Sequence, residues 1–250
     1  MQKIRIIPKL EIKNDHVIKG IQFDGLRKVG NPVELCKKYF KDGADQINIF
    51  DIVSSLYSRD QLYNFLDKIT KDIFIPVNIA GGITNIDQIK KLLECGADRV
   101  IINSGALRNP QFISEIANIF GAQFLTVSID VKKYNDRLYC MMDHGRENSN
   151  IEVEKWIKYL NSKNVAEIII TSIDNDGMQK GFDKNLISKL SPLVQSQLVV
   201  GGGVKNKEDF SKIISSYNVQ GISAASVFHF DIESIKGIKK FLLSKNYNII

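Results

Sequence analysis

Two stretches of the chain decide its fold: "IAGGITNIDQIKKLL" at residues 79–93 and "VGGGVKNKEDFSKII" at residues 200–214. Both begin with small or branched apolar residues, continue through consecutive glycines, and end in a segment with the apolar spacing of a helix. The copies begin at residues 79 and 200, so they lie about half of the 250-residue chain apart. A repeat at this distance indicates that the protein is built from two similar halves.

Shorter segments repeat at the same spacing. "ADQINIFDI" at 44–52 resembles "AEIIITSID" at 166–174, and "RVIINS" at 99–104 parallels "GISAAS" at 221–226. Each pair reads as a strand that ends in small or polar residues. Two copies of a four-strand half would make a closed barrel, whereas an open sheet gives no reason for such regularity.

Strand-like and helix-like segments alternate along the whole chain. "GNPVELCKKYF" is a clear helix start, with Asn31 as the cap and Pro32 at the first helical position. The predicted strands are 4–12, 46–52, 75–80, 98–103, 123–130, 166–173, 196–200 and 219–225, and the predicted helices include 58–72, 85–95, 110–119 and 206–216. This pattern predicts an α/β fold, a (β/α)8 TIM barrel of two repeated half-barrels in a single domain, 1–250. A doubly wound open sheet is the alternative.

Composition and charge limit the classes of function. Hydrophobic residues make up 44% of the chain and charged residues 25%, which suits a folded domain with a substantial core. Cys36, Cys95 and Cys140 show no paired spacing, and we find no secretory or membrane-spanning run, so we expect a cytoplasmic protein with reduced thiols and no membrane contact. The net charge of +6 favours an anionic small substrate over nucleic acid, because the basic residues form no dense stripe, although a solvated basic surface with no binding role fits the charge equally well.

Glycines and small polar residues follow the third, fourth, seventh and eighth predicted strands. Glycine lets backbone N–H groups approach an anion, and the next helix N-terminus adds its dipole. The usual phosphate site of a barrel follows strands 7 and 8, and the repeat supplies a second site across the mouth. We therefore expect a bisphosphorylated substrate, held by Gly81, Gly82, Asn103, Ser104, Gly202, Gly203, Ala225 and Ser226. Asp176 and Gly177 of "DNDG" are added as phosphate-site candidates, although Asp176 could equally be a turn former.

Charged residues at the predicted mouth suggest acid/base chemistry. Glu11 and Asp130 end the first and fifth strands, so they face each other across the barrel, and such a pair suits proton transfer. Lys19 lies in a long segment after the first strand, which we interpret as a mobile loop whose lysine holds phosphate or a developing negative charge. His144 follows a predicted hairpin insertion, and either substrate contact or simple exposure fits it. We expect no metal and no cofactor, because the three histidines form no cluster.

Specific motifs cover nearly the whole chain. They are "RIIPxLxxK", "IKG", "GADRVxIN", "FGAQ", "SID", "TSIDNDG", "GFD", "GGG" and "AASVFH". Together they resemble the cyclase subunit of imidazole glycerol phosphate synthase, a lyase of histidine biosynthesis. The resemblance implies that ammonia from a partner glutaminase is added to phosphoribulosyl-formimino-aminoimidazole carboxamide ribonucleotide. The products would be imidazole glycerol phosphate and aminoimidazole carboxamide ribotide.

The resemblance also implies roles for individual residues. Asp130 and the residue at position 11 would be the acid/base pair, and Lys19 would be the loop lysine of the family. Ammonia would enter at the bottom of the barrel through a gate formed by Arg5, Gln46, Arg99 and Glu167. Asp98 matches a residue at the contact with the glutaminase, so we expect a heterodimer with that subunit.

Four residues depart from the family pattern. At the gate, Gln46 and Arg99 stand where the family usually has glutamate and lysine. The other two lie on the first predicted strand. Position 11 is usually aspartate, and this chain has Glu11; position 9 is usually small, and this chain has Lys9. Since alternate strand residues share one face, Lys9 should lie in the lumen between Arg5 and Glu11, with Asn48 and Asn78 also pointing inward. A Lys9–Glu11 pair would favour the ionised form of Glu11 and oppose its use as a general acid.

These departures keep other functions open. One is a paralogue that delivers ammonia to another acceptor, such as an activated surface sugar. Another is a non-catalytic ammonia conduit that only activates its glutaminase. The related ribonucleotide isomerase shares the half-barrel repeat and the paired acids, but the gate residues and the "ASVFH" segment make it a poorer match.

Overall fold

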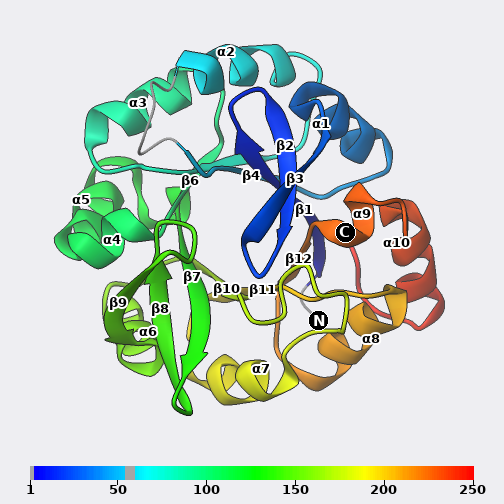
Figure 1. Ribbon diagram of the computed structural model, residues 1–250. Helices are drawn as coiled ribbons and strands as arrows, with labels where there is room; N and C mark the ends of the chain where they lie inside the picture. The colour runs from blue at the N-terminus through cyan, green and yellow to red at the C-terminus, as the bar shows by residue number, and fades with distance from the viewer. Residues whose placement is uncertain (1–2, 54–59) are drawn as a thin grey trace.

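The protein is a closed barrel of eight parallel strands surrounded by helices (Figure 1). The structure is a computed structural model that describes residues 3–53 and 60–250. Strand β1 pairs in parallel with β4 on one side and β12 on the other, and pairing of β7 with β10 completes the circle. The predicted (β/α)8 barrel is therefore confirmed.

The barrel strands match the eight predicted segments to within a few residues. They are β1 (Arg5–Lys13), β4 (Ile47–Asp51), β5 (Val77–Ala80), β6 (Arg99–Ile102), β7 (Leu125–Tyr134), β10 (Glu167–Ser172), β11 (Gln197–Gly201) and β12 (Gly221–Ala224). In the described ranges the helices are α1 (Pro32–Lys41), α2 (Asp60–Ile69), α3 (Ile86–Glu94), α4 (Ser104–Arg108), α5 (Gln111–Phe120), α6 (Val153–Ser162), α7 (Lys184–Leu190), α8 (Lys207–Ser216), α9 (Ser226–His229) and α10 (Ile235–Ser244), with short 3-10 turns η1 (Ala122–Phe124) and η2 (Ser191–Leu193). The first residues of the predicted helix 58–72 lie outside the described residues.

The repeated stretches fold alike because they carry the same local signals. Asn85 precedes α3 and accepts a hydrogen bond from the backbone N–H of Gln88, and Asn206 precedes α8 and accepts one from Asp209. A capping side chain of this kind satisfies an N–H group that has no partner within the helix. The predicted cap Asn31 does the same for α1, with Pro32 in the first turn.

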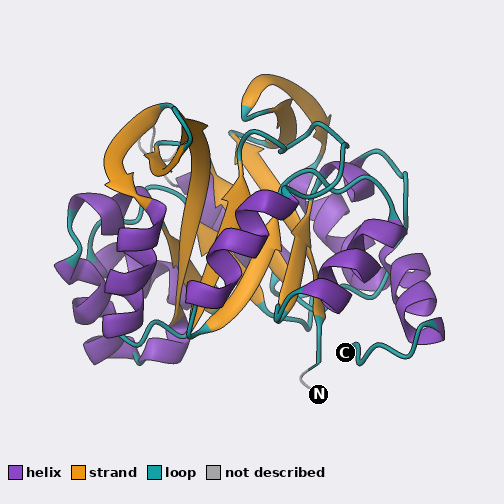
Figure 2. Cartoon of the chain, turned by 90° about the horizontal axis from the view of Figure 1, so that it is seen from below, coloured by secondary structure: helices purple, strands orange, loops and turns teal. Residues whose placement is uncertain are grey.

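Two antiparallel hairpins rise above the barrel at the carboxyl ends of its strands. They are formed by β2 (His16–Ile21) with β3 (Asp24–Gly30), and by β8 (Arg137–Met142) with β9 (Glu147–Glu152). Figure 2 shows both hairpins at one end of the barrel and the two termini at the other. The hairpin insertion predicted after the fifth strand is thus confirmed.

The segment after the first strand is not the loop that we predicted. It turns tightly at 14–15, where Asn14 adopts a left-handed backbone (φ 55°), and returns as β2 along β1. Asparagine tolerates this conformation at a hairpin tip, and branched residues on both sides favour pairing. Strand β2 therefore pairs with both β1 and β3, and the segment is part of the sheet and not the mobile loop that we expected.

The lumen of the barrel is only partly apolar. Ile7, Ala80, Ile101, Ile169 and Val199 form one apolar cluster in it. Asn48 and Asn78 are fully buried neighbours in the register of β4 and β5, as predicted from their position on the inward face. A larger apolar core lies between the strands and the outer helices.

Candidate active site

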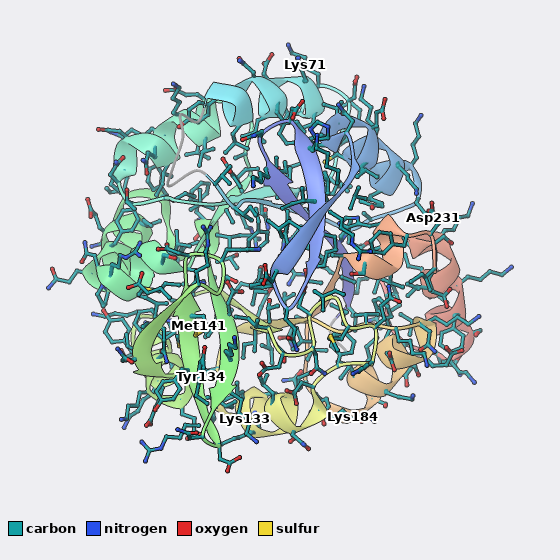
Figure 3. The ribbon with its side chains drawn as sticks, in the orientation of Figure 1. Lys71, Lys133, Tyr134, Met141, Lys184 and Asp231 are labelled. Atoms are coloured by element: carbon teal, nitrogen blue, oxygen red, sulfur yellow. The ribbon has the colours of Figure 1, made fainter. Side chains whose placement is uncertain are left out.

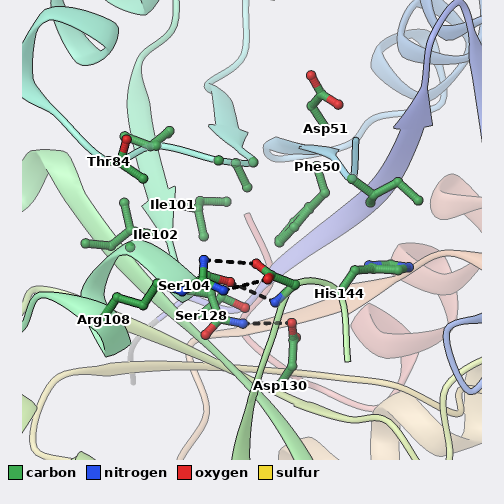
Figure 4. Close-up of a pocket in the computed structure, with 18 of the residues that line it drawn as sticks. Phe50, Asp51, Thr84, Ile101, Ile102, Ser104, Arg108, Ser128, Asp130 and His144 are labelled. Atoms are coloured by element: carbon green, nitrogen blue, oxygen red, sulfur yellow. Dashed lines mark hydrogen bonds and ion pairs between the residues drawn. The ribbon is translucent and has the colours of Figure 1, made fainter. Parts of the chain in front are cut away.

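The predicted phosphate residues line two pockets on opposite sides of the barrel mouth. Gly81 and Gly82 follow β5, and Asn103 and Ser104 follow β6; with Asp130 they line a cavity of about 330 Å³. Figure 4 shows Ser104 and Asp130 at this cavity, with His144 at its edge. The structure therefore brings together the first predicted set.

The second set lines a narrower cavity of about 20 Å³ below the β2–β3 hairpin. Its lining includes the predicted residues Gly177, Gly202, Gly203, Ala225, Ser226 and Asp176, together with Lys9 and Lys19. Gln22 of the hairpin donates its backbone N–H to the carbonyl of Asp176 at 2.8 Å. The hairpin thus lies directly against this second pocket.

The chain packing alone requires some of these glycines. Gly81 has φ 120°, and a Cβ there would lie 2.1 Å from the carbonyl oxygen of Asp51. Gly203 has φ 96°, and a Cβ there would lie 2.3 Å from the carbonyl oxygen of Gly181. Only glycine fits such positions. The support for anion binding therefore comes from the pairing of each glycine turn with a cavity and a serine.

Asp130 has the properties of a group that exchanges protons near neutral pH. Its side chain is 7% exposed on β7, and Oδ2 accepts a hydrogen bond from Asn103 Nδ2 at 2.9 Å. Its other oxygen, Oδ1, is buried and has no hydrogen-bond partner among the residues that the structure describes. Burial raises the pKa of Asp130 to about 6, against the opposing attraction of Lys9. A general acid or base works best with a pKa close to the working pH.

Glu11, in contrast, is held between two lysines. Lys9 Nζ lies 2.8 Å from Oε1, and Lys19 Nζ lies 3.0 Å from Oε2. Burial favours a higher pKa for Glu11, which is 1% exposed, but Lys19 and Lys9 together hold its pKa well below the usual range. The predicted Lys9–Glu11 pair is confirmed, and Glu11 is a carboxylate at neutral pH.

Lys19 is a buried member of the site and not a residue of an exposed loop. It lies on β2 with 4% of its surface exposed, and its ammonium group pairs with both Glu11 and Asp176. Burial favours a lower pKa for Lys19, but the two carboxylates outweigh this effect and raise it. The lysine is therefore a fixed cation beside the second pocket.

His144 joins the two hairpins above the mouth. Its ring stacks on that of Phe23 with centroids 4.4 Å apart, and its Nε2 is buried with no hydrogen-bond partner in the described part of the chain. Burial lowers the pKa of His144 to about 4, so the imidazole is neutral at physiological pH. His144 also lines the larger of the two cavities. Of the two positions that the sequence left open, the structure therefore has the one beside the candidate site.

A hydrogen-bonded cluster lies at the other end of the barrel. Arg5 Nη2 lies 2.6 Å from Glu167 Oε2, and Arg5 Nη1 donates to Gln46 Oε1 at 3.0 Å. Arg5 also donates to Gln197 Oε1 at 3.1 Å, a partner that we did not predict. Within the described ranges, no hydrogen bond or ion pair joins Arg99 to this cluster.

Asp98 lies at the same end, immediately before β6. Its carboxylate accepts a hydrogen bond from the backbone N–H of Val77 at 2.8 Å. The residue therefore ties the starts of β5 and β6 together, whatever its part in binding another protein.

Comparison with known proteins identifies the family. The model of the histidine biosynthesis protein family matches residues 5–233. The chain belongs to the histidine biosynthesis protein family. Proteins named imidazole glycerol phosphate synthase subunit HisF are similar to it: that of Natranaerobius thermophilus is 37% identical, with 98% of each chain covered, and that of Hydrogenobaculum sp. is 39% identical, also with 98% of each covered. The protein of that name from Legionella pneumophila is 40% identical over 84% of this chain and its own full length.

Other classes of site find no support in the part of this family member that the structure describes. No group of three or more histidine, cysteine, aspartate or glutamate side chains is arranged to hold a metal there, and Cys36, Cys95 and Cys140 are free thiols. None of the described helices has the length and apolar character needed to cross a membrane.

Sequence reasoning missed the aromatic residues around Lys9 in this member of the histidine biosynthesis family. The ammonium group lies 4.6 Å from the ring centre of Phe50 and 4.8 Å from that of Phe23. Phe50 follows Asn48 by two positions on β4, and alternate residues of a strand share one face, so the sequence could have predicted that Phe50 points into the lumen. Phe23 lies between β2 and β3, and nothing in the sequence showed where that segment folds back.

Proposed function

We propose that this protein is the cyclase subunit of an imidazole glycerol phosphate synthase in the cytoplasm. It uses ammonia to convert phosphoribulosyl-formimino-aminoimidazole carboxamide ribonucleotide into imidazole glycerol phosphate and aminoimidazole carboxamide ribotide. Relatives that carry the name of this synthase subunit match 98% of the chain. The family assignment to histidine biosynthesis agrees with that activity.

One structural observation carries the proposal: two glycine-lined pockets lie on opposite sides of a buried acid pair. The first pocket includes Ser104 and Asp130, and the second includes Ser226 with Lys19, which contacts Glu11. A substrate with a phosphate at each end would be fixed at both ends, so that its reacting centre lies over the two acids. Fixing a substrate in this way can supply a large share of a rate enhancement.

The partner in this proposal is a glutaminase that binds at the Arg5 end of the barrel and forms a heterodimer. Ammonia would then pass up the lumen, which contains buried polar side chains such as Asn48 and Asn78. Arg5 and Glu167 form an ion pair at this end, so in this proposal the two side chains separate when ammonia passes. Arg99 stands outside the contacts that Arg5 makes among the described residues, so its guanidinium can turn toward the entrance or the partner.

The alternatives left open by the sequence are not favoured. The relatives that match over nearly the whole chain are named as synthase subunits, which does not support delivery of ammonia to an activated surface sugar. A non-catalytic conduit has no need of Asp130, whose pKa of about 6 suits proton exchange.

The test is direct assay of the purified protein with the bisphosphorylated substrate and an ammonium salt. We expect both products, separated by chromatography and identified by mass spectrometry, and no reaction with glutamine unless a glutaminase subunit is added. Replacing Ser226 with aspartate would place a negative charge in the second pocket, and we expect KM to rise at least tenfold. Absence of both products with the folded wild-type protein would refute the proposed function.

A further inference from the structure

Lys9 is an unusual cation inside the barrel. Its side chain is 6% exposed, its ammonium group lies 2.8 Å from Glu11 Oε1, and the rings of Phe50 and Phe23 lie 4.6 and 4.8 Å away. Contacts of a cation with aromatic faces and with a carboxylate are both attractive, and they are stronger away from water. Lys9 is therefore held in one place by groups from β1, β4 and the β2–β3 hairpin.

The two acids at the mouth consequently have different freedom to take up a proton. Both oxygens of Glu11 face an ammonium group, Oε1 that of Lys9 and Oε2 that of Lys19. Protonation of Glu11 would sacrifice one of these contacts in a buried site. Within residues 3–53 and 60–250, Asp130 has one oxygen bonded to Asn103 and the other buried with no partner, so it can accept a proton without losing an ion pair to any of these residues.

We propose that Lys9 is a positioning residue that holds Glu11 as a permanent carboxylate, so that of the two acids Asp130 alone exchanges a proton during the reaction. This inference deepens the proposed cyclase function and rests on it. Glu11 then acts as a fixed negative charge that also holds Lys19 in place beside the second pocket. Of the two acids, Asp130 would transfer the proton, and Glu11 would supply only a negative charge.

The surrounding charges support this division. Glu11 is faced by Lys9, by Lys19 of β2, by His144 of the β8–β9 turn and by His229 of α9, and Lys19 joins it to Asp176. Both histidines have pKa values lowered to about 4 by burial, so among the described residues that face Glu11 the two lysines are the cations at neutral pH.

Asp130 is surrounded differently. It is faced by Lys9, Glu11, Asn103 and Asp176, and it acts in turn on the thiol of Cys140. Burial and the two other carboxylates raise its pKa, while Lys9 and Asn103 lower it. Removal of the Lys9 charge should therefore raise the pKa of both acids. Asp130 already titrates near neutral pH, so only Glu11 would change from a permanent carboxylate to a group that titrates.

A double-mutant cycle separates this role of Lys9 from a steric or gating role. The variants are Lys9→Met, Glu11→Gln and the double change, assayed with the bisphosphorylated substrate and ammonium, which bypasses the partner's ammonia supply. We expect Lys9→Met to lower kcat about tenfold or more with little change in KM and to add a second acidic limb to the pH profile. In the Glu11→Gln background the same change should alter kcat by less than about twofold.

The control is Lys71→Met, which removes an exposed lysine from the outer helical ring (Figure 3), where it pairs with Asp67. We expect its kinetics to equal those of the wild type. Equal losses from Lys9→Met in both backgrounds would overturn the proposal, because Lys9 would then act on the substrate or the lumen and not through Glu11.

A second readout needs no substrate, so it separates this inference from the cyclase function. Carbon-13 NMR of labelled side-chain carboxyl groups should show Asp130 titrating with a midpoint near pH 6, and Glu11 unchanged from about pH 4.5 to 8. In Lys9→Met, the Glu11 signal should begin to move in this range. Titration of Glu11 above about pH 5 in the wild type, or an unmoved Glu11 signal in Lys9→Met, would refute the inference even if the protein cyclises its substrate.

Discussion

Replacement of Asp130 with asparagine should stabilise the protein while it removes activity. Asparagine has nearly the same shape, and its amide oxygen can accept the hydrogen bond that Asn103 donates to Asp130. It cannot ionise, so the cost of a buried negative charge disappears. The change therefore separates the contribution of the carboxylate to turnover from its effect on the free energy of unfolding.

The size and pH dependence follow from the raised pKa. A rise of the Asp130 pKa from its ordinary value of 3.8 to about 6 means that the native state binds this proton more tightly than the unfolded chain. Native stability is thus lost as the pH rises from about 4 to 6, and the full cost of about 3 kcal/mol is present above pH 6. The Asp130→Asn variant should recover most of that free energy at about pH 7.5 and almost none at about pH 4.

The assay is urea unfolding of the wild type and Asp130→Asn at both pH values, with turnover measured in parallel. We expect turnover to fall about 100-fold or more, as is usual when a proton-transferring group is removed. Asp136→Asn is the control, because Asp136 is an exposed residue whose pKa is lowered by Lys133, so no stabilisation is expected. Equal effects of Asp130→Asn at the two pH values would refute the raised pKa, and retained turnover would refute the catalytic role.

Three further predictions concern other parts of the molecule. Asp98→Lys should weaken co-purification with a glutaminase more than Asp98→Asn does, since the asparagine keeps an acceptor for the N–H of Val77 while the lysine removes it and reverses the charge; equal retention would place the interface elsewhere. Glu11→Asp should lower kcat about tenfold or more, because the shorter side chain cannot reach both lysines; a faster variant would show that aspartate is the better residue there. His144→Ala should speed hydrogen exchange in the β2–β3 hairpin by removing the stack on Phe23, and unchanged exchange would contradict that contact.

The barrel could be predicted from the sequence because its signals are local and are repeated. The glycine turns, the asparagine caps and the apolar helix spacing in 79–93 and 200–214 each act within one strand–helix unit. Their repetition in the two halves then indicated a closed sheet. The β2–β3 hairpin was mistaken for a loop because one two-residue turn at 14–15 decides its course, and its long-range pairing leaves little trace in composition.

The site was predicted in part for the same reason. Strand alternation alone places Lys9 and Glu11 in the lumen with Arg5, and the pairing of Lys9 with Glu11 followed from their spacing. The second partner of Glu11 did not follow, because Lys19 reaches it only when β2 folds back along β1.

The contact of Lys19 with Glu11 determines what the contact of Lys9 with Glu11 can do. A single lysine beside Glu11 would leave one carboxylate oxygen able to take a proton, and Glu11 would remain a candidate acid. With Lys19 on the other oxygen and Asp176 behind it, the charges alternate in a buried row from Lys9 to Asp176. Protonating either acid in this row would leave a buried lysine short of its counter-charge, which is costly away from water. Asp130 lies outside the row, so its protonation breaks none of the ion pairs that the structure describes.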